Sequence, residues 1–107
     1  MTASFSFPGM MKISSIGHIP PGTGKVVQAG GKTIALFNVD GTFYALDNAC
    51  THRGGPLGEG RLAGTVVTCP WHGNQFDVTT GQVIVGTQCV RRHVVHVRNE
   101  DVLIELP

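Results

Sequence analysis

Short apolar runs separated by turn residues dominate the first half of the chain. Residues 26–29 are followed by Gly30-Gly31, and the apolar runs 32–39 and 42–46 are separated only by Asp40-Gly41. Asp-Gly between two such runs favours a two-residue hairpin turn, because both turn positions require a positive φ. The pattern therefore predicts antiparallel strands joined by tight turns.

The C-terminal part repeats this pattern. Residues 93–98 and 102–106 flank the polar turn 99–101, and shorter runs at 65–68 and 75–78 have β-like composition. No window shows a sustained helical period, and no segment has convincing helix caps. The sequence therefore predicts an all-β domain.

The region of about residues 48–82 differs from its surroundings. It is rich in glycine and holds two Cys-His pairs, and loops presented by a sheet scaffold commonly carry function. We expect residues 1–11 to form a disordered leader and residues 12–107 to fold as one domain, with the functional insertion at about 48–82.

Composition excludes several classes of protein. The 107 residues are 41% hydrophobic and 14% charged, with a formal net charge of +1, which is typical of a globular domain and gives no reason to expect nucleic acid. No apolar run approaches the roughly 20 residues that span a membrane, and the N-terminus lacks the features of a signal peptide. Three cysteines are too few for a disulfide scaffold, so we expect a reducing compartment, the cytoplasm.

The candidate chemistry lies in Cys50-Thr51-His52 and Cys69-Pro70-Trp71-His72, which together offer two thiolates and two imidazoles. Structural zinc sites with this ligand set usually pair Cys with Cys and His with His, whereas here each segment carries one of each. In an extended segment the side chains of residues i and i+2 point the same way, so a Cys-x-His pair can bind two neighbouring metal ions. The pattern favours a two-iron cluster; zinc and an accidental pattern remain the alternatives.

The segments Cys50-Thr51-His52-Arg53-Gly54-Gly55-Pro56-Leu57 and Cys69-Pro70-Trp71-His72-Gly73 resemble the two boxes of the Rieske [2Fe–2S] family. The resemblance extends over about residues 13–106. It implies an antiparallel β-sandwich or barrel scaffold, a loop-rich cluster-binding subdomain and one [2Fe–2S] cluster per chain. In this family Cys50 and Cys69 would hold the inner iron, and His52 and His72 the outer, more exposed iron.

Four positions bear on the reduction potential that the resemblance implies. High-potential members carry an extra Cys in each box and a Ser and a Tyr that bond the cluster sulfurs. The matching positions here are Gly55, Trp71, Asn74 and Phe76. We therefore expect a potential in the lower part of the family's range of roughly −150 to +300 mV.

The resemblance implies a one-electron carrier that passes electrons from a flavoprotein reductase to a terminal oxygenase and is not itself an enzyme. The alternative is the Rieske-like small subunit of an NAD(P)H nitrite reductase, and a zinc-stabilised binding module is a third hypothesis. The sequence does not identify the redox partners, the pathway substrate or the oligomeric state.

Three further residues are candidates for metal or thiol chemistry. Cys89 lies in an apolar run and is expected to be a small buried hydrophobe. His93 and His96 lie three residues apart on an expected strand, so they should face opposite sides and not share a metal.

Residues near the boxes and a basic stretch complete the prediction. We expect Pro56 and Leu57 to shield the cluster, and Trp71 either to pack over it or to contact a partner. The basic stretch of Arg91, Arg92 and Arg98 predicts a solvated face that could also dock an acidic partner.

Overall fold

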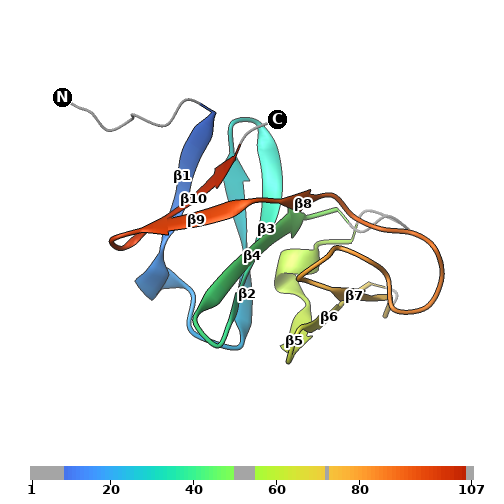
Figure 1. The fold of residues 1–107 in the computed structure, drawn as a ribbon. Helices are drawn as coiled ribbons and strands as arrows, with labels where there is room; N and C mark the ends of the chain where they lie inside the picture. Colours follow the sequence, from blue (N-terminus) through green and yellow to red (C-terminus); the bar gives the residue numbers. More distant parts are fainter. Residues whose placement is uncertain (1–8, 50–54, 72, 106–107) are drawn as a thin grey trace.

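The computed structural model describes residues 9–49, 55–71 and 73–105, and within them all paired strands are antiparallel (Figure 1). One sheet has the order β1 (Met10–Ser15), β10 (Asp101–Glu105), β9 (Val95–Arg98); we call it the outer sheet. The central sheet has the order β2 (Thr23–Ala29), β3 (Lys32–Val39), β4 (Thr42–Asp47), β8 (Arg92–His93). A small sheet has the order β5 (Arg61–Ala63), β6 (Val66–Thr68), β7 (Gln75–Asp77).

The described part of the chain contains two short 3₁₀ turns, η2 (Ile16–His18) and η3 (Leu57–Glu59), and no α-helix. The all-β prediction is therefore confirmed. No helix in these residues is long and apolar enough to cross a membrane.

The turns of the central sheet follow the predicted chemistry. Asp40 and Gly41, between β3 and β4, have φ values of 50° and 92°, and Gly30 and Gly31, between β2 and β3, have 57° and 85°. Two successive positive φ values match the twist of the flanking strands in a two-residue hairpin. The three strands β2, β3 and β4 consequently form one continuous antiparallel meander.

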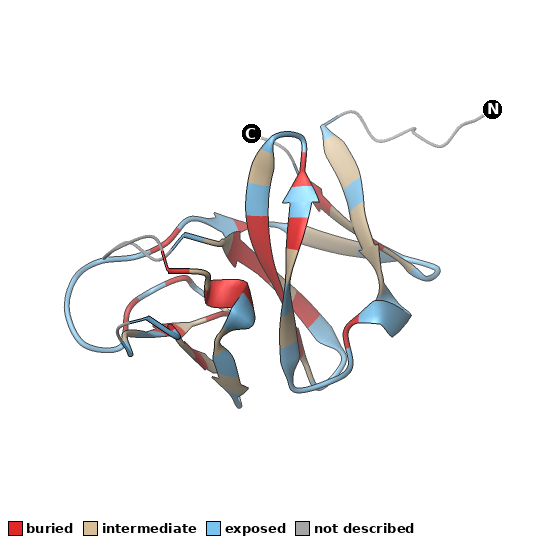
Figure 2. Cartoon of the chain, turned by 180° about the vertical axis from the view of Figure 1, so that it is seen from behind, coloured by how far each residue is buried: buried red, intermediate tan, exposed pale blue. Residues whose placement is uncertain are grey.

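Strand β3 is buried on both faces, which explains its uninterrupted apolar run. Ile34 and Leu36 belong to one hydrophobic cluster, whereas Ala35 and Phe37 belong to the other. Because side chains alternate along a strand, these clusters lie on opposite sides of the central sheet. Figure 2 shows buried residues gathered where the layers meet, with exposed residues along the outer loops.

The two clusters define three layers. The scaffold core lies between the outer and central sheets and contains Ile19, Val27, Ala29, Ile34, Leu36, Phe43, Ala45, Val102 and Ile104. The second core lies between the central sheet and the loop subdomain, which we define as residues 48–90. It contains Ala35, Phe37, Leu46, Leu57, Val67, Cys69, Phe76, Val78, Val83 and Val90.

The ends of the fold differ from the sequence prediction in two places. β1 begins at Met10, two residues before the expected domain start, and Met11 pairs with Ile104 of β10. The expected strand 93–98 is divided between sheets: Arg92–His93 pairs with β4, and Val95–Arg98 pairs with β10. The final turn consists of Asn99, at φ 58°, and Glu100, because Arg98 pairs directly with Asp101.

The loop subdomain also extends beyond its expected end at residue 82. Val83 and Val90 are buried in the same core as Phe76, and an isolated bridge joins Gln82 to Cys89. The segment between Val83 and Val90 therefore belongs structurally to the loop subdomain.

Candidate metal centre

The first Cys-His segment leaves the central sheet at the end of β4, and hydrogen bonds close the base of its loop. The Leu57 amide donates to the Asn48 carbonyl at 2.8 Å, and the Gly58 amide donates to the Asn48 side-chain oxygen at 2.8 Å. An isolated bridge also joins Ala49 to Pro56. The chain at Pro56 and Leu57 thus lies beside Asn48 and Ala49, where it leaves the central sheet.

The second Cys-His segment has a similar closed base. The Cys69 amide donates to the Asn74 carbonyl at 2.8 Å, and the Gly73 amide donates to the Cys69 carbonyl at 3.0 Å. Gly73 has φ 78°, the left-handed region that favours glycine. β6 leads into this loop and β7 leads out of it, so a two-stranded ladder fixes the position of Cys69.

The two loops touch at Gly55. A Cβ atom placed on Gly55 would lie 2.6 Å from Cys69 Sγ, 3.1 Å from Trp71 Cγ and 3.2 Å from Trp71 Cβ. The backbone of the first loop therefore approaches the cysteine sulfur of the second loop at a distance that only glycine permits. The same contact brings together Gly55 and Trp71, the two positions where high-potential family members carry their extra cysteines.

Of the four predicted ligands, the structure describes Cys69. Its side chain is 2% exposed, in the core that also holds Leu57, Val67 and Phe76. Cys50, His52 and His72 lie outside the described residues. Among the residues that are described, no group of three or more His, Cys, Asp or Glu side chains could hold a metal, so the ligand set as a whole stays a prediction.

The surroundings of Cys69 fit a soft metal cluster. A buried thiolate is the preferred donor for iron–sulfur clusters, and close backbone approach by glycine suits a group with bulky sulfides. Leu57 is fully buried and Pro56 is partly buried; their role in shielding the cluster stays a prediction. Trp71 lies against Gly55 of the first loop, yet 59% of its surface is exposed; its expected packing over the cluster and its expected contact with a partner both stay predictions.

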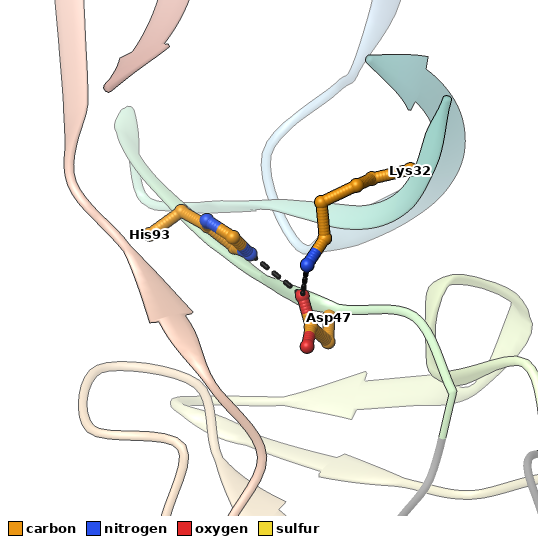
Figure 3. Close-up of polar contacts among 3 residues, drawn as sticks. All are labelled: Lys32, Asp47 and His93. Carbon is orange, nitrogen blue, oxygen red and sulfur yellow. Dashed lines mark hydrogen bonds and ion pairs between the residues drawn. The ribbon is translucent and has the colours of Figure 1, made fainter. Parts of the chain in front are cut away.

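Polar contacts among Lys32, Asp47 and His93, which the sequence did not predict, hold the end of the strand that leads to Cys50 (Figure 3). The Asp47 carboxylate, at the end of β4, lies 2.7 Å from His93 Nε2 and 3.6 Å from Lys32 Nζ. Because an ionised carboxylate only accepts, Nε2 carries the proton and donates. The His93 side chain is 3% exposed and that of Asp47 is 32% exposed, so this partly buried bond joins β8 to β4, three residues before Cys50.

The remaining expectations have mixed outcomes. Cys89 is exposed, so its prediction as a buried hydrophobe is wrong: only the ends of its segment enter the core. His93 is buried against Asp47, whereas His96 bonds Glu105 at 2.8 Å on the surface, and the two do not share a site. Sequence inspection offers no signal for the Asp47–His93 bond, because 46 residues separate its partners.

The basic stretch lies on the surface as predicted. Arg91, Arg92 and Arg98 are all exposed. Their side chains belong to the scaffold and not to the loop subdomain, since β8 and β9 carry two of the three.

Comparison with known proteins relates this architecture to one family. The Rieske [2Fe–2S] domain family matches residues 9–99. The ferredoxin component of the naphthalene 1,2-dioxygenase system of Pseudomonas aeruginosa is 38% identical over 91 residues, which are 83% of this chain and 88% of the relative. A chain in the complex of reduced oxygenase and oxidized ferredoxin of carbazole 1,9a-dioxygenase is 32% identical, with a TM-score of 0.83 over 91% of this chain and 93% of that chain.

The fold is also shared with a chain described as the NADH-dependent nitrite reductase small subunit of Mycobacterium tuberculosis. That chain has a TM-score of 0.82 and 21% identity, and the match covers 89% of this chain and 92% of the other. At this identity the likeness concerns the fold alone.

Proposed function

Because the chain belongs to the Rieske [2Fe–2S] domain family, we propose that Cys50, His52, Cys69 and His72 hold its single [2Fe–2S] cluster. The observation that carries the ligand proposal is the contact between the Gly55 backbone and the buried sulfur of Cys69. It joins the two loops at one point, and each loop contributes one Cys and one His. A bound cluster of this kind supplies one-electron transfer, with a potential raised by its two imidazole ligands.

The protein is an electron carrier, a ferredoxin-type component, and not the catalytic enzyme of its system. Its relatives at 36–39% identity are ferredoxin components of naphthalene and biphenyl dioxygenase systems. The described residues perform the supporting tasks of such a carrier. Hydrogen bonds hold the residues that flank both ligand segments, and the core around Leu57 and Phe76 excludes water from the Cys69 side.

The two pairs of proposed ligands have different tasks in this arrangement. Cys69 points into the core, and we assign it with Cys50 to the inner iron. We assign His52 and His72 to the outer iron, where their imidazoles would form the exit for the electron. Because the exposed Trp71 directly precedes His72 in the sequence, we expect electron transfer near Trp71.

Replacement of single ligands tests the assignment. Cys69→Ala should abolish the visible absorption and the iron content of the purified protein, because one iron loses a thiolate. Cys89→Ala is the matched control, since Cys89 is an exposed cysteine of the same subdomain and should keep a full cluster. His52→Ala and His72→Ala should resemble Cys69→Ala; a normal spectrum in any of the three ligand variants contradicts the proposed set.

The potential should lie in the lower part of the family's range, below roughly +100 mV. Two observations support this expectation: Phe76, which has no hydroxyl, is fully buried near Cys69, and Asn74 meets Cys69 through its backbone carbonyl. Protein-film voltammetry measures the value directly. A potential well above that limit would contradict this expectation.

For the partners, we propose a flavoprotein reductase as electron donor and a terminal oxygenase as acceptor, both in the cytoplasm. The oxygenase is supported by the relative that forms a complex of this type. The nitrite reductase alternative has weaker support, because that likeness is restricted to the fold. Reconstituted turnover tests the proposal: in the presence of the aromatic substrate, reductase, this protein and an oxygenase of a naphthalene or carbazole system should consume NAD(P)H and oxygen together, and omission of this protein should stop both.

A further inference from the structure

We propose that the loop between β7 and β8, through Ile84 and Val85, is an apolar docking contact for the terminal oxygenase. The inference rests on the electron-carrier function proposed above and adds the chemistry of its interface. Val85 is 87% exposed and Ile84 is 48% exposed. Exposed apolar side chains that cluster beside a functional site mark interaction surfaces.

The exposed tip is held in place by its own base. Val83 and Val90 are 7% and 4% exposed and anchor the two ends in the core. The Val83 amide donates to the Gln88 carbonyl at 3.0 Å, and the Ile84 amide donates to the Gln75 carbonyl at 2.8 Å. The apolar tip is therefore presented in a fixed position, and little conformational entropy is lost when a partner covers it.

The tip lies beside the second ligand loop. Val83, Ile84 and Val85 share the lining of a surface hollow of about 110 Å³ with residues 73–75, which directly follow the proposed ligand His72. Figure 1 shows this loop passing around the outer side of the small sheet, at the end of the molecule opposite the β9–β10 turn. A partner that approaches the second ligand loop closely enough to exchange an electron would meet the tip.

The charge distribution identifies the kind of surface that would fit. Between Leu62 and Val90 the sequence carries one charged side chain, Asp77. The carboxylate of Asp77 accepts hydrogen bonds from the Thr79 amide at 2.8 Å and the Thr79 hydroxyl at 2.6 Å, so it is used within its own turn. Within the two ligand boxes, residues 50–57 and 69–73, Arg53 is the one charged residue.

An uncharged surface of this kind is complementary to an uncharged apolar surface, because a charged partner group would lose its hydration without gaining a counter-ion. The occupant to which we commit is the terminal oxygenase proposed above, the kind of partner bound in the complex of a related ferredoxin, and it would present an uncharged apolar recess to the tip. Association should depend little on charge steering: raising the ionic strength from about 50 to about 500 mM should change the rate by less than about threefold.

The test compares charge at Val85 with the same charge on the scaffold. Val85→Asp and Val85→Lys are paired with Val97→Asp and Val97→Lys, since Val97 is a 48% exposed valine of β9 in the outer sheet. The measured quantity is the second-order rate at which each reduced protein reduces a terminal oxygenase in stopped flow. The oxygenases are those of naphthalene and carbazole dioxygenase systems, and the one that the unmodified protein reduces faster is used for the variants.

Both Val85 variants should slow this rate by about tenfold or more, as expected for a central apolar contact. Both Val97 variants should stay within about twofold, as surface substitutions generally do. The rate with a neutral benzoquinone as small oxidant should be unchanged in all four, which shows that the cluster itself is intact.

Opposite effects of Asp and Lys at Val85 would show electrostatic steering and overturn the inference, and so would unchanged rates in both. Sedimentation that shows a dimer of the unmodified protein, dissociated by Val85→Asp, would assign the tip to a second copy and likewise overturn it. If the unmodified protein reduces neither oxygenase, the proposed oxygenase partner fails, and this inference fails with it. If only the Val85 variants behave contrary to expectation, the electron-carrier function stands.

Discussion

The scaffold and the loop subdomain are stabilised in different ways. In the scaffold, β2 pairs with β3 over seven residue pairs and β3 with β4 over six, Thr23↔Asn38 to Ala29↔Lys32 and Ile34↔Asp47 to Val39↔Thr42. In the loop subdomain each strand has three residues, and individual hydrogen bonds and glycine contacts hold the described residues beside the ligand segments. In the scaffold many residue pairs therefore share the stabilisation, whereas single contacts in the loop subdomain decide whether the metal site can form.

Gly55→Ala should have the largest effect and should act on the site alone. The added methyl group would lie 2.6 Å from Cys69 Sγ, so either the sulfur or the first loop must move. We expect the purified variant to lose most of its iron and visible absorption. Far-UV circular dichroism should remain that of the β scaffold, because its long ladders are not touched.

Gly17→Ala is the matched control for Gly55→Ala. Gly17 lies in η2 of the scaffold, its φ is not in the left-handed region, and a Cβ placed there meets nothing within 4 Å. This variant should retain full iron content. A fully loaded Gly55→Ala protein would show that the contact with Cys69 adjusts easily and that the site is not as finely fitted as the comparison implies.

The scaffold could largely be predicted from sequence because its signals are local. The turn Asp40-Gly41 defines the register of β3 and β4, and the expected strands 32–39 and 42–46 agree with the structure to within one residue. β1 was not predicted because its sequence shows no alternation of apolar and polar residues. This agrees with its burial, since five of its six residues are half-buried. The division near Val94 was not predicted because β8 pairs with the distant strand β4, whereas β9 pairs with the adjacent strand β10.

The next largest effect should come from core truncations, and it should separate the two regions. Leu57 and Ile104 are 0% and 1% exposed and belong to the second core and the scaffold core respectively. Leu57→Ala and Ile104→Ala should each lower the free energy of unfolding by about 2–5 kcal/mol. Urea denaturation followed by circular dichroism measures this loss.

The difference between these variants should appear at the cluster. Leu57 packs in the same core as Cys69, so Leu57→Ala admits water beside the sulfur and should shift the reduction potential. Ile104→Ala acts on the far side of the central sheet and should leave the potential unchanged. Equal shifts in both variants would mean that the two cores respond as one, contrary to their separation by the central sheet.

The candidate site was predictable as chemistry but not as geometry. The sequence carries the four proposed ligands at their spacing, and Cys69 lies in a buried loop position that suits a ligand. The residues that build its base, chiefly Asn48 and Asp47, have no motif, because their partners Gly58 and His93 become neighbours only through folding. For Cys89 the prediction from sequence was wrong. Its apolar neighbours indicated burial, yet Cys89 is exposed and only Val83 and Val90 of its segment are in the core.

The smallest effect should come from the bond between β4 and β8 of the scaffold, just before the chain enters the first loop. His93→Ala removes a buried ring whose Nε2 donates to Asp47 at 2.7 Å, and a hydrogen bond to a charged group contributes about 1.5–3 kcal/mol. His96→Ala is the matched control, because His96 makes a similar bond to Glu105 at 2.8 Å between side chains that are 41% and 50% exposed. Exposed pairs contribute about 0–1 kcal/mol, so thermal or urea unfolding should distinguish the two variants.

Asp47 ends β4 three residues before Cys50, and we therefore expect His93→Ala, unlike His96→Ala, to release iron faster to a chelator. Equal release from both variants would show that the base of the first loop depends on Asn48 alone and that the scaffold does not support the site through His93.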